Sequence, residues 1–118
     1  MKAVDIEVSK SGDVCIVDIA GEVRIGEPTR LLRRTSKELI ERGERRFVLD
    51  MLDVPWLDSS GLGEVFASYK RAREVGGEVR LVLRGKSYSL FTITQLDRVF
   101  RIFDSTDEAV ASFAEQAE

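Results

Sequence analysis

Apolar residues along the chain recur at two spacings, and segments with one spacing alternate with segments of the other. Near the N-terminus Val4, Ile6 and Val8 alternate with polar residues, which predicts a half-buried strand. Four further short apolar runs have the length of strands: 14–20, 46–51, 78–83 and 99–103. Elsewhere apolar residues recur every three or four positions, which predicts helices. The expected helices begin at Glu27-Pro28, just after Ser59-Ser60, near Lys86 and after Ser105.

Residues that start and stop helices flank these segments. Pro28 suits the first turn of a helix, and Gly43 suits its end. The spacing of Ser105 and Glu108 is that of a capping box, which predicts that the last helix starts there. This helix is expected to bury Val110, Phe113, Ala114 and Ala117. Ser11-Gly12-Asp13 predicts a hairpin turn between the first two strands.

An opening hairpin followed by alternating helices and strands predicts an α/β fold. We expect one domain over residues 1–118, with a mixed, mostly parallel sheet of about five strands and about four helices packed on it. In such sheets binding surfaces lie beyond the carboxyl ends of the strands. The loop that holds Arg24 and the segment around Ser59 both follow predicted strands, so we expect them to be neighbours.

The stretch from Val54 to Gly63 (VPWLDSSGLG) has the strongest functional pattern in the chain. It joins a predicted buried strand to a predicted helix, so its two serine hydroxyls are expected at a helix N-terminus, where free N–H groups favour an anion such as a phosphate. Asp58 and the serines are also ordinary capping residues, and that structural interpretation stays open. Gly61 and Gly63 favour a site, because glycine in a first helical turn costs up to about 1 kcal/mol and permits close approach of another surface.

Composition excludes several classes of function. The chain has 118 residues, 43% hydrophobic and 33% charged, as in globular proteins. Its 18 basic and 21 acidic residues include no basic tract, so we expect no nucleic-acid partner. Apolar runs of about six residues are too short to cross a bilayer, and acidic residues near the N-terminus do not fit a secretory signal. The single cysteine, Cys15, is expected to be a buried, unreactive thiol in a cytoplasmic protein.

Candidate catalytic chemistry is poorly supported. The chain has no histidine, which rules out a serine–histidine pair, and Leu57 stands where a nucleophile elbow needs glycine. Asp50, Asp53 and Asp58 lie where aspartate commonly forms turns, so we expect no metal site. A phosphate-binding loop is absent, and we expect no cofactor. Trp56 has two open interpretations, as a core residue or as an anchor for a partner.

The residues around this stretch resemble a known family. Val48-Leu49-Asp50, followed by Trp56 to Gly63 (WLDSSGLG), is similar to the motif of STAS domains, the anti-sigma factor antagonists and their relatives. The resemblance extends to Gly21-Glu22, to Gly76-Gly77-Glu78 and to residues 96–102, and so covers almost the whole chain.

The resemblance implies a non-enzymatic, partner-switching regulator of bacterial transcription or stress signalling. In similar antagonists, an anti-sigma factor that is also a serine kinase of the histidine-kinase-like ATPase type phosphorylates the serine after the motif aspartate, which here is Ser59. The unmodified protein binds this kinase, the phosphorylated form is released, and a serine phosphatase resets it. The alternative is a constitutive adaptor, for example in a lipid-transport ATPase complex. The expected partner surface comprises Arg24, Trp56, Asp58, Ser59, Ser60, Gly61, Leu62 and Gly63.

Arg24 departs from the family pattern. Relatives usually carry an aspartate two residues after the glutamate of the Gly-Glu pair, and here Arg24 occupies that position after Glu22. Our hypothesis is that the Arg24 guanidinium pairs with a phosphate on Ser59 through charge-assisted hydrogen bonds. The alternative, a solvated loop charge, stays open.

Overall fold

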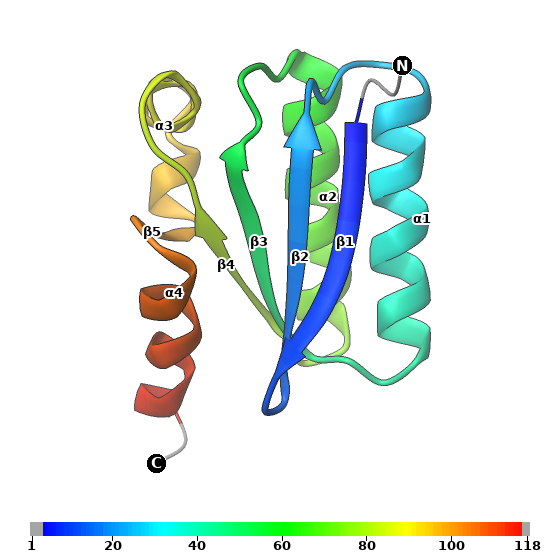
Figure 1. Ribbon diagram of the computed structural model, residues 1–118, viewed down its shortest axis with the longest axis vertical. Helices are drawn as coiled ribbons and strands as arrows, with labels where there is room; N and C mark the ends of the chain where they lie inside the picture. The colour runs from blue at the N-terminus through cyan, green and yellow to red at the C-terminus, as the bar shows by residue number, and fades with distance from the viewer. Residues whose placement is uncertain (1–3, 117–118) are drawn as a thin grey trace.

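Five strands form one mixed sheet in the order β1-β2-β3-β4-β5 (Figure 1). The structure, a computed structural model, describes residues 4–116. The strands are β1 (Val4–Ser11), β2 (Val14–Gly21), β3 (Arg46–Asp53), β4 (Glu78–Val82) and β5 (Arg101–Phe103). The first two form an antiparallel hairpin through Gly12 (φ 61°), and every later pairing is parallel. The predicted mixed, mostly parallel sheet with an opening hairpin is confirmed.

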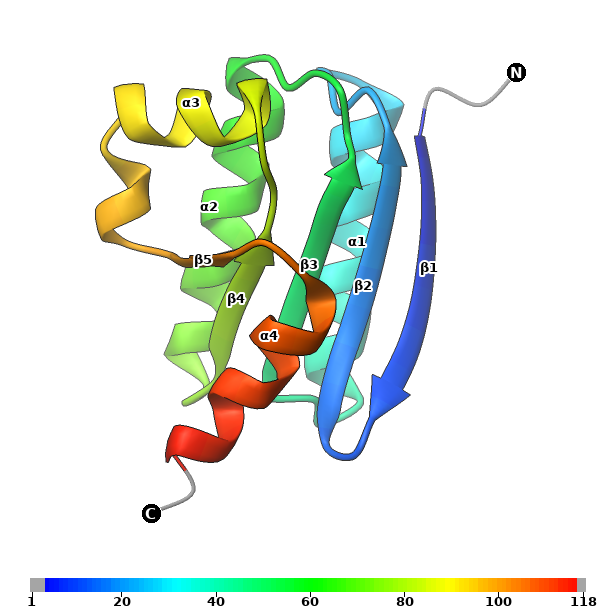
Figure 2. The ribbon, with the colours of Figure 1, turned by 60° about the vertical axis from the view of Figure 1, so that its left-hand side comes forward.

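Four α-helices cover the sheet, as predicted. They are α1 (Glu27–Glu41), α2 (Ser59–Glu74), α3 (Lys86–Ile93) and α4 (Thr106–Ser112). The main core lies between the sheet and α1, α2 and α3, and it contains Leu32, Val65 and Phe91. A smaller core forms on the opposite face, where α4 packs on β3, β4 and β5 (Figure 2). The sheet is therefore the middle layer of three.

The fifth strand is shorter than the sequence predicts. We expected residues 99–103, but β5 begins at Arg101, after a short 3-10 helix over Leu96–Arg98. The Phe100 side chain is buried, and its ring centroid lies 5.0 Å from that of Tyr69 and 5.8 Å from that of Phe91. This aromatic packing takes Phe100 into the main core instead of the sheet.

The apolar side of the last helix also differs from the prediction. Phe113 is buried and Val110 partly buried, as expected, but Ala114 is exposed. The α-helix ends at Ser112 and continues as a 3-10 helix over Phe113–Gln116, whose tighter winding changes the direction of each following side chain. Ala117 lies outside the described residues.

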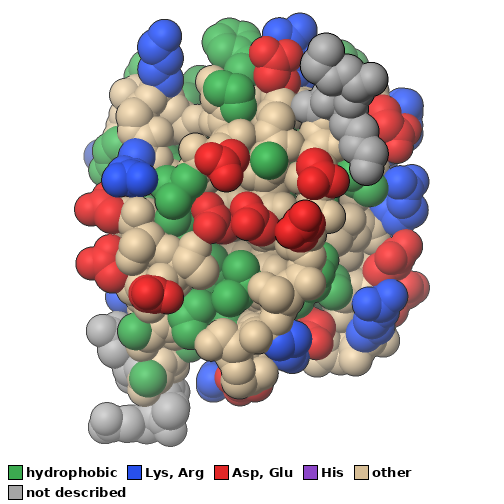
Figure 3. Space-filling view, viewed as in Figure 1, with side chains coloured by type: hydrophobic (Ala, Val, Ile, Leu, Met, Phe, Trp, Pro, Cys, Tyr) green, Lys and Arg blue, Asp and Glu red, His purple; other side chains and the backbone are tan. Residues whose placement is uncertain are grey.

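The sheet face that α4 covers only in part carries a row of carboxylates on β1, β2 and β3 (Figure 3). Around Asp18 on β2, the acidic residues whose charges act on it are Asp5, Glu7, Asp50 and Asp53. Partial burial, together with the charges of the other four, raises the pKa of the Asp18 carboxyl above its ordinary value.

The Cys15 side chain lies on the other face of the sheet, in the main core. It is fully buried, as predicted, and burial raises the pKa of its thiol to about 11.

Within residues 4–116, none of the helices combines the length and the apolar character needed to cross a membrane.

Candidate functional site

Two loops meet at the carboxyl end of the sheet, one after β2 and one after β3. The backbone N–H of Val23 donates to the Trp56 carbonyl at 3.0 Å, and the N–H of Asp58 donates to the Val23 carbonyl at 3.3 Å. Val23 and Leu57 form a parallel bridge, and both side chains are buried. The predicted proximity of the Arg24 loop and the serine motif is therefore confirmed.

The Asp58 carboxylate joins these loops to the start of α2. One oxygen, Oδ1, accepts a hydrogen bond from the Gly61 N–H at 2.8 Å, which is the predicted helix cap. The other, Oδ2, accepts from the Ile25 N–H at 2.9 Å. The hydrogen bonds from Ile25 and Gly61, with a smaller contribution from the Arg24 charge, hold the pKa of Asp58 below its ordinary value. The carboxylate fixes both loops in its ionised form.

Ser59 is the first residue of α2, and it is exposed. Ser60 follows and is partly buried. Both hydroxyls therefore lie at a helix N-terminus, as the sequence predicts, and the Ser59 hydroxyl is reachable from solvent. The ionised carboxylate of the capping residue Asp58 already lies at this helix N-terminus, and no further acidic residue occupies the first turn of α2.

The two motif glycines, Gly61 and Gly63, have different neighbours. A Cβ atom on Gly61 would lie 2.1 Å from the Val23 carbonyl oxygen, so the surface that approaches Gly61 is the chain's own loop after β2. A Cβ on Gly63 would meet no atom within 4 Å, and Gly63 faces solvent. Between them, Leu62 packs partly buried against the main core. Of the two glycines, Gly63 is therefore the one whose backbone is open to a partner.

Two large apolar side chains are exposed beside Ser59. Trp56 is 51% exposed and Ile25 is 75% exposed, while Val54 and Leu57 anchor the loop after β3 in the core. The Ser87 hydroxyl at the start of α3 donates to the Val54 carbonyl at 2.9 Å and holds the loop from its other side. The interpretation of Trp56 as a core residue is therefore wrong. Ile25 was missed, although an isoleucine beside Gly26 in a polar loop is a usable signal.

Arg24 lies on the same surface and pairs within its own loop. Its Nη2 atom lies 2.9 Å from Glu22 Oε1, and both side chains are about half exposed. Its charge contributes to the low pKa of Asp58, the residue next to Ser59. The Arg24 guanidinium therefore acts on Asp58 through its charge while it is paired with Glu22. Because this ion pair is exposed, the guanidinium can exchange the Glu22 carboxylate for another anion.

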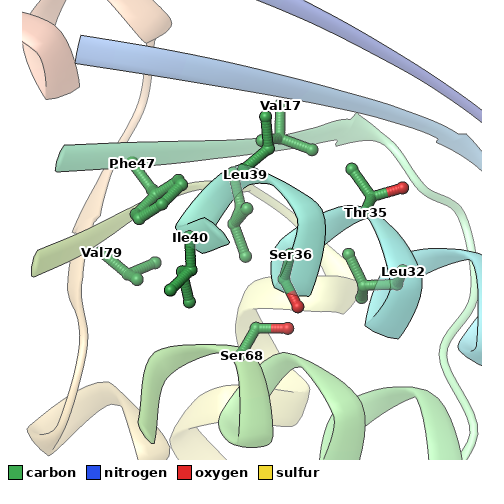
Figure 4. A pocket seen from close by; sticks show the side chains of 10 residues that line it. Val17, Leu32, Thr35, Ser36, Leu39, Ile40, Phe47, Ser68 and Val79 are labelled. Carbon is green, nitrogen blue, oxygen red and sulfur yellow. The ribbon is translucent and has the colours of Figure 1, made fainter. Parts of the chain in front are cut away.

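Among residues 4–116, the structure brings together no group of three or more His, Cys, Asp or Glu suited to a metal ion. Asp50 instead accepts hydrogen bonds from the Thr106 hydroxyl at 2.6 Å and from the Leu52 N–H at 3.1 Å, which is a structural role. A narrow apolar pocket lies under α1 and α2, with Ser36 and Ser68 facing each other across it (Figure 4).

This fold has counterparts among known proteins. The family model described as STAS domain matches residues 5–109. The anti-sigma-B factor antagonist of Bacillus subtilis (strain 168) is 29% identical over 109 residues, which cover 91% of this chain and 97% of that protein. The anti-sigma F factor antagonist of Paenibacillus polymyxa is 27% identical over 107 residues, covering 89% and 91%. A solved anti-sigma factor antagonist from Mycobacterium paratuberculosis shares the fold, with a TM-score of 0.81, 24% identity and coverage of 92% of each chain.

Proposed function

The chain belongs to the STAS domain family, and we propose that it is a cytoplasmic anti-sigma factor antagonist that switches partners. In its unmodified form it binds an anti-sigma factor, which is also a serine kinase of the histidine-kinase-like ATPase type. Phosphorylation of Ser59 by this kinase ends the complex, and a serine phosphatase restores the binding form. The chain itself performs no catalysis. The names of its relatives in Bacillus and Paenibacillus support the general role.

The exposed Ser59 hydroxyl beside two exposed apolar side chains is the observation that carries this proposal. Ile25 and Trp56 supply the apolar area that a protein interface needs at its centre, and the loops that carry them meet at the helix start where Ser59 lies. A phosphate adds a charge of about −1.5 to −2. Buried in an interface without a counter-charge, it would cost about 3 kcal/mol, which weakens binding more than a hundredfold.

The same phosphate is stabilised in the free protein. The positive dipole end of α2 favours an anion at Ser59, while the ionised Asp58 carboxylate, which accepts from the Gly61 N–H, keeps the first turn in place. We propose that Arg24 stabilises the phosphorylated form. In that form its guanidinium leaves Glu22 and donates hydrogen bonds to the phosphate on Ser59. The released monomer then has a defined structure.

The role of Arg24 can be measured directly on the phosphorylated protein. Phosphorus NMR titration of wild type and Arg24→Ala is expected to show a higher pKa of the phosphoserine in the variant, because the guanidinium favours the dianion. The control is Arg34→Ala, since the Arg34 guanidinium pairs with Glu27 at the start of α1. An identical phosphoserine pKa in all three proteins would remove this role from Arg24.

Phosphorylation separates the switch from a constitutive adaptor that uses the same surface. The purified cognate kinase and ATP are incubated with wild type, Ser59→Ala and Ser60→Ala, and the modified residue is located by mass spectrometry. We expect one phosphate on wild type and on Ser60→Ala, and none on Ser59→Ala. If the wild type binds the kinase stably yet stays unmodified, the adaptor role replaces the switch.

A further inference from the structure

A groove on the molecular surface runs between α1 and α2 and begins beside the proposed phosphorylation site. Its walls are Ile25, Thr29, Arg33, Lys37, Ser60, Gly63, Glu64, Ala67 and Arg71. Building on the proposed function, we propose that this groove receives an acidic helical segment of the anti-sigma factor. The partner would then contact a surface that extends from Ser59 along the two helices.

The spacing of the lining residues makes the groove continuous. On α1, Thr29, Arg33 and Lys37 are four residues apart and lie on one side of the helix. On α2, the stripe starts at Ser60 and ends at Arg71, a rise of about 16 Å. That length matches about three turns of a docked helix.

Small residues on α2 leave the groove open on that side. Gly63 and Ala67 face the groove between Ser60 and Arg71, and a Cβ on Gly63 would meet nothing within 4 Å. A glycine here lowers helix propensity, and the fold obtains no packing contact from it. A glycine in the groove wall leaves the backbone open and lets a partner helix approach closely, which explains why glycine occupies this position.

The groove is positively charged although the chain as a whole has a net charge of −3. Glu64 is only 4% exposed, and it accepts hydrogen bonds from Arg33 Nε at 3.0 Å and from Arg71 Nη1 at 2.8 Å. This one carboxylate fixes two guanidinium groups in place and neutralises one of them. Lys37 adds a further charge and has no ion pair among the described residues. The lining therefore carries an excess of two positive charges.

The distribution of these charges favours an acidic protein segment. Arg33 and Lys37 are one helical turn apart, and Arg71 approaches from the facing wall. Carboxylates spaced one turn apart on a partner helix can meet such a row, and charge complementarity of this kind sets specificity and the rate of encounter. A nucleic acid would need more cations than these, because its affinity comes from many phosphate contacts.

A matched pair of charge reversals tests this inference. Lys37 lines the groove, whereas Lys70 is exposed elsewhere on α2, 5.9 Å from the ring of Phe66. Binding of the purified cognate anti-sigma factor is measured by calorimetry at low and high salt. We expect Lys37→Glu to weaken binding about tenfold and to reduce its salt dependence, with Lys70→Glu within about twofold of wild type. Carbodiimide coupling of the wild-type complex should join the Lys37 amine to a partner carboxylate.

The outcomes separate this inference from the function on which it rests. If Ser59→Asp abolishes binding while Lys37→Glu binds as wild type does, the groove is not part of the interface and the switch stands. Equal losses of affinity for Lys37→Glu and Lys70→Glu would also contradict the role of the groove, because binding would then depend only on the total charge of the protein. If the wild type does not bind the anti-sigma factor, both proposals fail. Salt-dependent binding of an RNA or DNA oligonucleotide that Lys37→Glu abolishes would assign the groove to nucleic acid instead.

Discussion

The Asp58 carboxylate accepts a hydrogen bond from the Ile25 N–H at 2.9 Å and so ties the loop after β2 to the start of α2. Its other oxygen caps the helix at Gly61. The loop that carries Arg24 and Ile25 is therefore held beside Ser59 by a residue next to that serine in the chain. A charge added at Ser59 lies close to this connection.

An Asp58→Asn variant is expected to separate the two hydrogen bonds. The asparagine carbonyl can keep the cap at Gly61, but its amide nitrogen cannot accept from the Ile25 N–H. We expect faster amide exchange at Ile25 and unchanged protection at Gly61, measured by NMR. Because the pKa of Asp58 is lowered, wild type should approach this behaviour as the pH falls through that pKa, and above it the connection is complete. Equal protection of Ile25 in both proteins would contradict the role of Oδ2.

The two motif glycines provide a pair of stability measurements. Gly61→Ala should lower the free energy of unfolding by about 2 kcal/mol, because its Cβ would lie 2.1 Å from the Val23 carbonyl oxygen and the backbone must shift. Gly63→Ala places its methyl group in open space and should raise the free energy of unfolding by up to about 1 kcal/mol through helix propensity. Urea denaturation checks both values. Similar losses for the two variants would mean that Gly61 does not limit the approach of the loop.

Much of this site follows from local pattern, and the rest depends on tertiary contacts. A strand followed by Asp58-Ser59-Ser60 predicts the cap and the exposed hydroxyl, since both arise within one turn of chain. The exposure of Trp56 depends instead on Val54 and Leu57 filling the core on either side of it, and neighbouring apolar residues do not reveal which of them points inward. Arg24 pairs with Glu22 and acts on Asp58 only through its charge, and spacing alone does not determine which of the two carboxylates it contacts.

The elements of the fold were also predictable to different degrees. The helical spacing of apolar residues predicted α1 and α2, whereas β2, β3 and β4 were predicted from short apolar runs, which the structure buries on both faces. The end of the chain was less regular, since Phe100 joins the core with Tyr69 and Phe91 before β5 begins. The buried carboxylate of Glu64 is paired with Arg71 of its own helix and with Arg33 of α1, and the pairing with Arg33 has no local signal.

Ser68 gives a prediction about the contact between α1 and α2. Its hydroxyl is buried in the narrow pocket of Figure 4 and has no hydrogen-bond partner among the described residues. Ser68→Ala should therefore raise the free energy of unfolding by about 1 kcal/mol, measured by urea denaturation. The control is Ser36→Ala, whose hydroxyl donates to the Arg33 carbonyl and accepts from Arg71, so its loss should destabilise the protein. Destabilisation by Ser68→Ala would show that this hydroxyl is satisfied in solution.

The acidic sheet face makes stability depend on pH. The pKa of Asp18 is raised in the folded protein, so the folded state holds this proton more tightly than the unfolded chain. Above that pKa the ionised Asp18 destabilises the fold, and stability recovers as the pH falls towards the unfolded value of about 4. We expect Asp18→Asn to raise the melting temperature at pH 7 and to lose this advantage near pH 4.

The control for this measurement is Glu38→Gln, an exposed charge on α1 away from the acidic face. It should change the melting temperature little at either pH. An Asp18→Asn protein with the same melting temperature as wild type at pH 7 would contradict the repulsion among these carboxylates.

Binding of the purified anti-sigma factor to four proteins tests the central claim most directly: wild type, Ser59→Ala, Ser59→Asp and Ser60→Asp, compared by isothermal titration calorimetry. The account predicts that Ser59→Ala binds as wild type does and that Ser59→Asp loses at least about a hundredfold in affinity, with a smaller loss for Ser60→Asp. Equal affinity of Ser59→Asp and wild type would contradict it.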